Sequence, residues 1–587
     1  MSVTPIRLVG MSASTPAKPW VPAPQDPPRQ RASAAAPSLS HHPSRIAPRE
    51  PLIVRLDRFI AASTTSKPGA AIDKLRQPLP PDRWIGWLVT LVITALSFVI
   101  RLVNLGHPDK IMFDETYYAK DAWSLLQYGY EGTWVGDATQ VKEQVAQGDW
   151  SALTSTPSWA VHPPLGKWLI AVGEWFFGLN PFGWRFMALV FGTLTVFVVI
   201  RLARRLSHST LIGGLAGLLL SVDGLSFVLS RLALLDIFQS FFIVAGVACV
   251  VADRAHFRNR LADHLLTQPG HSLAGRAGPF VFRGWLIGAG VMFGAGCAVK
   301  WTTVYPLAVF AVLALVWSLL ARRLAGAGRR SWWGLVSDGL PAFVSMVVLA
   351  VGVYLASWIP WLHTAGGFER QWGASHPDDW VVRHFGAPLG SLWRNQVDTF
   401  HFHTGEQMAK ATHTYGSSAW VWPLDGRTVG IFAENNIMPG EQGCAAVTGQ
   451  TCMRVVTALG TPFLWWAGAL ALLVALVWWL AGLDWRFGAP VLGFAATWLP
   501  WFFTGRGAIF SFYAVTMVPF TVIALAMVLG VVLGPARAGP RRKRGAMIVG
   551  AIVGAIILDF AFVYPILTGE LMTRRAWQLR MWLPGWV

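Results

Sequence analysis

Residues 84–105 read WIGWLVTLVITALSFVIRLVNL, and this stretch decides the fold class. It holds a single charged residue, Arg101, and is long enough to cross the hydrocarbon core of a bilayer as a helix. Ten more apolar stretches follow, which predicts an all-α polytopic membrane protein with about 11 transmembrane helices. We expect these further spans at about 184–204, 210–228, 235–252, 283–300, 302–320, 336–358, 456–480, 488–504, 507–533 and 546–566.

The composition agrees with a membrane protein. Of 587 residues, 54% are apolar and 13% are charged, whereas soluble domains carry about 25% charged residues. Collagen, coiled coils and disulfide-framed small proteins are excluded, the last because the chain has only four cysteines. The net charge of +18 could suggest nucleic acid. Most of that charge falls in loops on one side of the membrane, so we expect no nucleic-acid partner.

The basic loops set the expected topology. RAHFRNR (254–260), ARRLAGAGRR (321–330) and PARAGPRRKR (535–544) all fall on one side if 165–180 does not span. The positive-inside rule makes that side cytoplasmic. We therefore predict a multi-pass plasma-membrane protein with a cytoplasmic N-terminus and an extracytoplasmic C-terminus. Two long loops, about 106–183 and 359–455, then lie outside.

The chain divides into two expected regions. Residues 1–83 are rich in Pro, Ala and Ser and predict a disordered cytoplasmic N-terminal tail, without the apolar core of a signal peptide. Residues 84–587 form the transmembrane catalytic domain. Within it, 165–180 (LGKWLIAVGEWFFGLN) is short and carries two charges, so we expect an amphipathic helix at the membrane interface. In the second outer loop, Cys444 and Cys452 can form a small disulfide if that compartment is oxidising.

An acidic pair opens the first outer loop. In KIMFDETYYAKDAW (110–123), Asp114 and Glu115 are adjacent. Their side chains point in different directions, so one could accept a proton from a hydroxyl while the other positions a substrate. A solvated acidic turn is the plainer alternative. The aromatic residues on either side favour a drier site, which would make the carboxylates more basic.

Cations gather at the outer ends of the spans, against the usual charge bias. For each one, a structural ion pair competes with ligand binding, but together they indicate an anion. Arg231 lies close to Asp236 in sequence, and the two could neutralise each other. Arg506 lies between two glycines, has no such neighbour, and is the best candidate for gripping phosphate. The set comprises Arg101, Arg185, Arg231, Lys300 and Arg506.

The segment VHPPLGKW (161–168) contributes His162 and Lys167. Two prolines fix the backbone before the interfacial helix, and Lys167 follows one turn inside it. A cation at headgroup depth suits a lipid phosphate, although a lysine can also reach the interface without a ligand. His162 alone is as consistent with a structural role.

The second outer loop contains FHFHTGEQMAKATHTYGSSAWVWPLDGR (400–427). Its histidines, His401, His403 and His413, are poorly spaced for zinc, so we expect no metal. Tyr415 and Trp420 suit either a wall that stacks on sugar or an anchor at the membrane interface. The sequence leaves these two roles open.

No phosphate-binding loop, dinucleotide fingerprint or GxSxG nucleophile motif is found in the sequence. Chemistry at an outer acidic site needs a substrate that is present outside, where nucleotide sugars generally are not. A sugar linked to a lipid phosphate meets that requirement.

Five segments carry a family resemblance. They are FDETYYAKDAW (113–123), HPPLGKW (162–168), LSRLALLD (229–236), HTYGSSAWVWP (413–423) and RGAIFSFYAVTMVPF (506–520). In this order the chain resembles the bacterial, actinobacterial-type protein O-mannosyltransferases of glycosyltransferase family 39. The resemblance implies a GT-C fold and the transfer of mannose from polyprenyl phosphate mannose to Ser or Thr of exported proteins, with inversion at the anomeric carbon.

The resemblance also implies roles for single residues. Asp114 matches the general base and Glu115 its partner in acceptor binding, and Arg101 and Arg185 match arginines that matter in the family. His162 and Lys167 match its HPP-x-x-K stretch. We expect Arg506, Lys167 and Arg231 to bind the donor phosphate, and His413, Tyr415 and Trp420 to contribute to the site. No cofactor other than the lipid-linked donor is expected, and the Sec translocon is a hypothetical partner.

Two other functions compete with this one. Another GT-C lipid-phosphate-sugar transferase, acting on a glycolipid or cell-wall glycan, would share the acidic pair and differ in its acceptor. A transporter would place its ionisable residues at the membrane midplane. In this chain the acidic pair lies outside the spans, which favours the enzyme.

Overall fold

Long apolar helices dominate the structure, a computed structural model that describes residues 70–76, 79–447 and 449–587. In that part of the chain, seven helical segments are long and apolar enough to cross a membrane. They are α3 (Arg83–Leu102), α7 (Pro181–Ser207), α10 (Leu235–Leu266), Trp301–Leu324 with α12 (Val304–Leu324), the broken run Gly328–Ser357, α21 (Pro462–Gly482) and α24 (Pro540–Thr568).

Four of the expected spans are shorter helices. Three are apolar, namely α8 (Thr210–Ser221), α11 (Gly284–Val299) and α23 (Val518–Leu533), and the fourth is α22 (Trp485–Trp498). Each of the eleven predicted stretches therefore contains a helix, but only seven reach spanning length, so the number of crossings stays a prediction. The run 328–357 is broken into α13 (Gly334–Ser337), α14 (Gly339–Phe343), a π-turn (Val344–Val348) and α15 (Leu349–Ser357).

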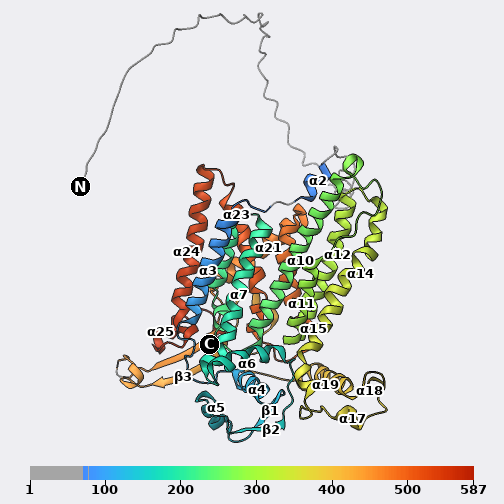
Figure 1. Cartoon of the computed structure of the whole chain (residues 1–587). Coiled ribbons are helices and arrows are strands. Elements are labelled where there is room, and N and C mark those ends of the chain that lie inside the picture. Colours follow the sequence, from blue (N-terminus) through green and yellow to red (C-terminus); the bar gives the residue numbers. More distant parts are fainter. Residues whose placement is uncertain (1–69, 77–78, 448) are drawn as a thin grey trace, which may run out of the picture. The chain divides into compact units, whose positions relative to one another are not determined.

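The two long loops contain further helices, which Figure 1 shows at the opposite end of the apolar helices from α2. The first loop holds α4 (Glu115–Tyr128), α5 (Ala138–Ala146) and α6 (Leu165–Phe177). The second holds α16 (Ile359–His363), α17 (Trp372–Ser375), α18 (Trp380–Phe385), α19 (Ala387–Thr404) and α20 (Glu406–Ala409). The short elements α9 (Gly224–Leu229), η2 (Trp301–Thr303), η8 (Ser511–Thr516) and α25 (Arg574–Gln578) complete the parts used below.

The structure also contains two small antiparallel sheets, which the prediction of an all-α protein did not include. In the first loop, β1 (Gly132–Trp134) pairs with β2 (Leu153–Pro157). The second sheet has the order β3 (Val429–Ile437), β4 (Cys452–Ala458), β5 (Met572–Thr573), and Val429 lies opposite Ala458. Because β5 follows the last long helix, this sheet brings the C-terminal segment beside the second loop. A disulfide between Cys444 and Cys452 joins the loop of the β3–β4 hairpin to β4.

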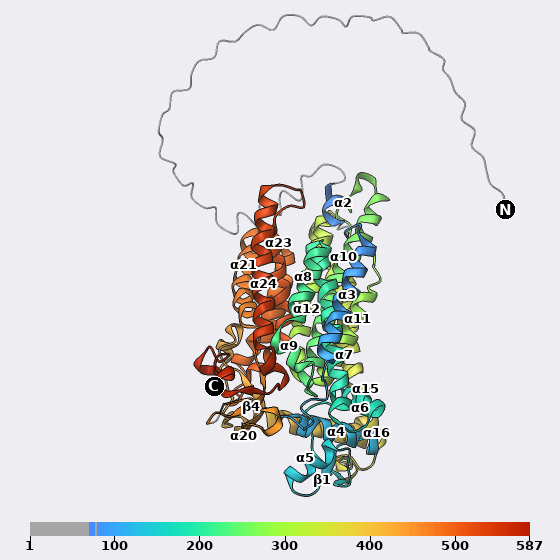
Figure 2. The ribbon, with the colours of Figure 1, turned by 90° about the vertical axis from the view of Figure 1, so that its left-hand side faces the viewer.

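Helix α10 forms the centre of the packing. The apolar window of α10 is 83% buried, whereas that of α3 is only 22% buried. A helix that is apolar on all sides and buried belongs to a core, while one with exposed apolar side chains suits contact with lipid. Figure 2 shows α10 behind and between other helices. Its N-terminal end meets the loop helices and brings Asp236 to them.

The C-terminal end of the predicted N-terminal tail is partly helical. The prediction for residues 1–69 lies outside the described residues. Residues 70–75, however, form helix α2 (Ala70–Leu75), and Ile72 and Leu75 are buried against α10 residues such as Phe257 and Leu261. The two apolar side chains are three residues apart, so they share one helix face and can pack together.

The expected helix over 165–180 is present as α6, but its polar residues face inward. Lys167 and Glu174 are buried, whereas Trp175 and Phe176 are 69% and 64% exposed. Exposed aromatic rings are typical of the membrane interface. The orientation suits an interfacial position through the aromatic rings and not through Lys167.

Candidate active site

Asp114 lies immediately before α4. It occupies the N-cap position with helical backbone angles, φ −71° and ψ −6°, and its side chain caps no backbone N–H. In residues 70–76, 79–447 and 449–587, its carboxylate accepts no hydrogen bond. The pKa of Asp114 is raised to about 6, chiefly by burial, with Lys300 opposing the shift and Asp236 adding to it. Asp114 is therefore a carboxylate that remains available to a substrate.

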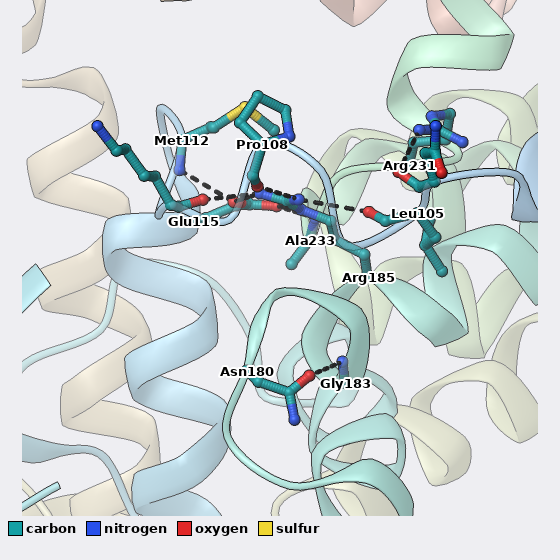
Figure 3. Close-up of polar contacts among 11 residues, drawn as sticks. Leu105, Pro108, Met112, Glu115, Asn180, Gly183, Arg185, Arg231 and Ala233 are labelled. Atoms are coloured by element: carbon teal, nitrogen blue, oxygen red, sulfur yellow. Dashed lines mark hydrogen bonds and ion pairs between the residues drawn. The ribbon is translucent and has the colours of Figure 1, made fainter. Parts of the chain in front are cut away.

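Glu115 has the opposite environment, which Figure 3 shows. Its oxygens accept hydrogen bonds from Arg185 Nε (2.8 Å) and Nη2 (2.9 Å). The backbone N–H groups of Met112 and Ala233 also donate to it, at 2.9 and 3.2 Å. The side chain is fully buried. These bonds occupy both oxygens, which favours a positioning role for Glu115 over the expected contact with the acceptor.

Arg185 also holds the loop before Asp114. Its Nη atoms donate to the carbonyl oxygens of Leu105 (3.3 Å), Pro108 (2.8 Å) and Lys110 (2.8 Å). The loop closes around the guanidinium, and Phe113 adopts a left-handed conformation with φ 49°. For a bulky residue that conformation is costly and needs support from its surroundings. Arg185 and Glu115 supply this support and fix the position of Asp114.

The local sequence explains where Arg185 lies. The Asn180 side chain accepts a bond of 2.9 Å from Gly183 N, and Pro181 occupies the first turn of α7. Gly183 is required because a Cβ there would lie 2.1 Å from the Gly178 carbonyl oxygen. This tight α6–α7 turn, included in Figure 3, places Arg185 in the first two turns of α7.

Two other arginines expected at the site serve the end of α3. Arg231 donates to the carbonyl oxygens of Arg101 (2.6 Å), Val103 (2.6 Å) and Asn104 (2.8 Å). A cation that binds the last carbonyls stabilises a helix end. Arg101 is fully buried and donates to Ser97 Oγ at 2.7 Å and to the carbonyls of Leu220 and Ser221, both at 3.2 Å. Three of the five N–H donors of Arg231 are thus used by backbone carbonyls, which favours a structural role over the expected binding of phosphate.

Lys167, which was expected to bind the donor phosphate, also has partners within the protein. Its Nζ forms an ion pair with Glu131 and lies 3.8 Å from Asp121, and the side chain is 1% exposed. The partner Glu131 lies 36 residues away in the chain, so the local sequence gave no sign of the pairing. Two carboxylates neutralise this buried lysine inside the loop region, which favours a structural role over the expected binding of a lipid phosphate.

Lys300 is the cation that the sequence analysis undervalued. It follows α11, and its Nζ binds both oxygens of Asp236, at 2.9 and 2.8 Å. The expected Arg231–Asp236 pair is thus replaced by Lys300–Asp236. Lys300 also lies 5.1 Å from the centre of the Tyr513 ring. A small pocket beside Asp236 is also lined by Gln239, Thr302, Thr497 and Tyr513, together with apolar side chains.

Arg506 keeps its availability, as expected. Its Nε is buried without a hydrogen-bond partner, and its Nη2 meets only the Met408 sulfur, at 3.7 Å. No carboxylate forms an ion pair with it in the part of the chain that the structure describes. A buried guanidinium without a counter-ion suits an anionic ligand.

His162 and His403 bring the two outer loops together. Their rings stack with centres 5.5 Å apart. Burial lowers the pKa of both imidazoles, and Lys300 and Arg506 lower it further. His162 and His403 therefore lie within electrostatic range of both cations. His403 was not among the expected site residues, since only the fold brings α19 to the HPP segment.

Of the remaining candidates of the second loop, His413 and Tyr415 contact each other, whereas Trp420 packs on different aromatic rings. His413 packs on Phe510 (5.0 Å) and near Tyr415 (5.9 Å). Phe510 in turn contacts Phe113, which precedes Asp114. Trp420 is 70% exposed and packs on Phe502 at 4.6 Å, an arrangement closer to an interface anchor than to a sugar wall.

The histidines of this loop do not assemble a metal site. His401 is exposed and His403 contacts His162 instead of His413. Among the residues described, no group of three or more His, Cys, Asp or Glu side chains converges as a metal site would require. Whether the reaction needs a metal stays a prediction.

Comparisons with known proteins show which family this chain resembles. The family model described as dolichyl-phosphate-mannose-protein mannosyltransferase matches residues 91–365. The model of the C-terminal four-TMM region of protein-O-mannosyltransferase matches residues 388–586. The polyprenol-phosphate-mannose–protein mannosyltransferase of Mycobacterium tuberculosis is 37% identical over 86% of this chain and 93% of its own. That of Mycolicibacterium smegmatis is 38% identical over 86% of this chain and 94% of its own.

A solved structure shows the same fold. It is the Saccharomyces cerevisiae protein O-mannosyltransferase Pmt1–Pmt2 complex bound to the sugar donor. The match has a TM-score of 0.63 and 14% identity, and covers 89% of this chain and 95% of the other. The GT-C fold and the family that the sequence analysis expected are thereby confirmed.

Proposed function

This chain belongs to the dolichyl-phosphate-mannose–protein mannosyltransferase family of glycosyltransferases, and from that premise we propose how it works. It transfers mannose from polyprenyl phosphate mannose to Ser and Thr hydroxyls of exported proteins, with inversion at the anomeric carbon. The observation that best supports this function is the environment of Asp114. Its carboxylate accepts no hydrogen bond in the described part of the chain, and burial raises its pKa to about 6.

Asp114 acts as the general base. The acceptor hydroxyl oxygen attacks C1 of mannose, and its proton passes to the Asp114 carboxylate. The bond between C1 and the phosphate oxygen breaks, and the polyprenyl phosphate leaves with that electron pair. A base with a pKa near the working pH is ionised and still basic enough to take the proton, which contributes about 10²–10⁴-fold to the rate.

Arg506 and Lys300 stabilise the leaving phosphate. Arg506 has a buried Nε without a partner, and Lys300 keeps a third N–H donor besides the two that bind Asp236. The phosphate of the donor already leaves as a weakly basic anion, so neutralising its charge matters more than protonating it. Preorganised cations in a site with little water are effective at this task.

The site belongs on the extracytoplasmic side. The basic stretches 254–260 in the C-terminal part of α10, 321–330 at the end of α12 and 535–544 at the start of α24 lie at the other end of the helices from α4, which favours a cytoplasmic location for them. An outer site meets exported polypeptides while they are still unfolded. The Sec translocon is the partner that would deliver such chains.

Mannose transfer by the purified protein tests the function. The assay uses polyprenyl phosphate mannose and a peptide rich in Ser and Thr, with and without EDTA. We expect transfer that persists in EDTA, falls at least a hundredfold in Asp114→Asn, and falls in Arg506→Met. Asp109→Asn is the matched control, because Asp109 is an exposed carboxylate of the same loop, and it should retain the wild-type rate.

Two results would redirect the proposal. If the donor is consumed only with a glycolipid acceptor, the protein acceptor is wrong and the glycosyltransferase remains. If Asp114→Asn and Asp109→Asn behave alike, Asp114 is not the base.

A further inference from the structure

We propose that His162 and His403 form the binding wall for the mannosyl group of the donor, and that His403 Nδ1 accepts a hydrogen bond from one hydroxyl of that sugar. The inference rests on the proposed function and assigns a sugar subsite within it. It is carried by a continuous series of ring contacts and by one buried nitrogen without a partner.

The ring contacts connect the base to the phosphate-binding cations. Tyr118 lies one turn after Asp114 on α4, and its ring centre is 6.3 Å from that of His162. His162 stacks on His403 at 5.5 Å, and His403 meets Trp301 edge-on at 6.1 Å. Trp301 follows Lys300 directly in the chain.

A donor sugar must span this same interval. Its C1 has to face the acceptor and Asp114, while the phosphate on C1 has to reach Lys300 and Arg506. A row of flat rings between the two is suited to packing against a pyranose ring. The lowered pKa of both imidazoles, caused by burial and by the same cations, supports a place beside Lys300 and Arg506.

The hydrogen bonds of His403 define which nitrogen is free. Nε2 lies 3.0 Å from the carbonyl oxygen of Val161, which can only accept, so Nε2 carries the proton. In the neutral ring Nδ1 then has a lone pair and acts as an acceptor. Nδ1 is buried and has no partner in the described part of the chain.

An unsatisfied buried acceptor is costly unless a ligand supplies the donor. Neither Lys300 nor Arg506 donates a hydrogen bond to Nδ1 in the described part of the chain. A sugar hydroxyl is a donor of the right kind and belongs to the substrate that occupies this interval. A donor whose sugar lacks the hydroxyl that bonds to Nδ1 should therefore react more slowly.

Two substitutions separate the sugar contact from the structural contact. In His403→Asn, the amide oxygen is bonded to Cγ, as Nδ1 is, so an acceptor remains there while the bond to Val161 is lost. In His403→Gln, the amide nitrogen can reach the Val161 carbonyl, but no acceptor remains at the Nδ1 position. His401→Ala is the matched control, because His401 is exposed on the same helix.

The readout is kcat/KM with polyprenyl phosphate mannose and its 2-, 3-, 4- and 6-deoxymannosyl analogues. In the wild type, one analogue should react about tenfold more slowly than the parent donor, the effect of one lost hydrogen bond. His403→Gln should shrink that difference to about twofold or less, whereas His403→Asn and His401→Ala should keep it. Thermal unfolding shows that each variant is folded.

The outcomes are distinct. If no analogue loses more than about twofold in the wild type, no hydroxyl is bonded in this way and the proposal is overturned. It is also overturned if His403→Gln keeps the discrimination and His403→Asn loses it, because His403 then acts only through Val161. Failure of the wild type to transfer mannose from the parent donor to any acceptor would instead reject the proposed function.

Discussion

At the scale of single residues, Asp114 and Glu115 show how two neighbouring carboxylates acquire different tasks. Glu115 is the first residue of α4, and the fold supplies it with Arg185 and two backbone N–H groups. Asp114 precedes the helix and receives none of these bonds. The carboxylate that is satisfied holds the loop, and the one left unsatisfied is available for chemistry.

The pH dependence of the reaction should follow Asp114. The base must be deprotonated to accept a proton, and burial raises its pKa to about 6. We therefore expect kcat/KM to fall about tenfold per pH unit below pH 6 and to level off above about pH 7. The measurement is a rate profile from about pH 4.5 to 8 in a single buffer series. A rate that stays constant down to pH 5 would contradict this assignment.

Glu115→Gln should act on stability more than Asp114→Asn does. Removing one charge from the buried Glu115–Arg185 pair leaves the guanidinium uncompensated, which typically costs about 3–5 kcal/mol. Asp114 has no ion pair to lose. The measurement is the thermal unfolding temperature of both variants in detergent, and Glu115→Gln should unfold at a clearly lower temperature. Equal unfolding temperatures would show that the pair does not hold the loop.

At the scale of elements, the sequence predicted helices well because they depend on local patterns. All eleven apolar stretches contain helices, and the short amphipathic segment 165–180 appears as α6. The partners of buried charges were predicted poorly. Arg231 and Asp236 are five residues apart, yet the fold gives Arg231 to the end of α3 and Asp236 to Lys300.

The same limitation explains the two small sheets and the histidine pair. β5 joins β4 from more than a hundred residues away, and His403 meets Val161 across 242 residues. Contacts between residues so far apart in the chain leave no local sequence pattern from which they could be predicted. Asp114 could be proposed from one short sequence motif, whereas Lys300 and His403 become candidates only through contacts in the assembled structure.

The β3–β4 hairpin gives a prediction for an element. The Cys444–Cys452 disulfide closes a loop with a sequence separation of 8. By loop-closure entropy, such a small loop contributes about 2–3 kcal/mol. The double variant Cys444→Ser/Cys452→Ser should therefore be cut faster by protease within 438–452, while the long helices unfold at the same temperature. Unchanged cleavage would show that the sheet holds the hairpin without the bond.

At the scale of the whole molecule, the described chain separates its charges by location. The helices connect basic loops at one end with the loop helices, both sheets and Asp114 at the other (Figure 1). Buried ion pairs such as Arg322–Asp338 and Arg283–Asp253 neutralise part of the basic end, while Arg541 and Arg544 are exposed. This separation is the physical basis of the proposed topology.

The topology can be measured with single cysteines. Ser151 and Ala538 are exposed residues at opposite ends of the apolar helices. In intact cells, a thiol reagent that cannot cross the membrane should label Ser151→Cys, and it should label Ala538→Cys only after the membrane is opened. The unsubstituted protein provides the background from Cys249 and Cys297. The reverse pattern would place the site in the cytoplasm.

The contact of Arg231 with the end of α3 has a consequence for the order of biosynthesis. The carbonyls of Arg101, Val103 and Asn104 leave the ribosome well before their donor, which follows Arg101 by 130 residues. Glu115 waits in the same way for Arg185 and for the Ala233 N–H. In a nascent chain, the loop before Asp114 therefore lacks these contacts until Arg231 and Ala233, between α9 and α10, have been synthesised. Early fragments of this protein carry the catalytic aspartate but not the means to hold it in place.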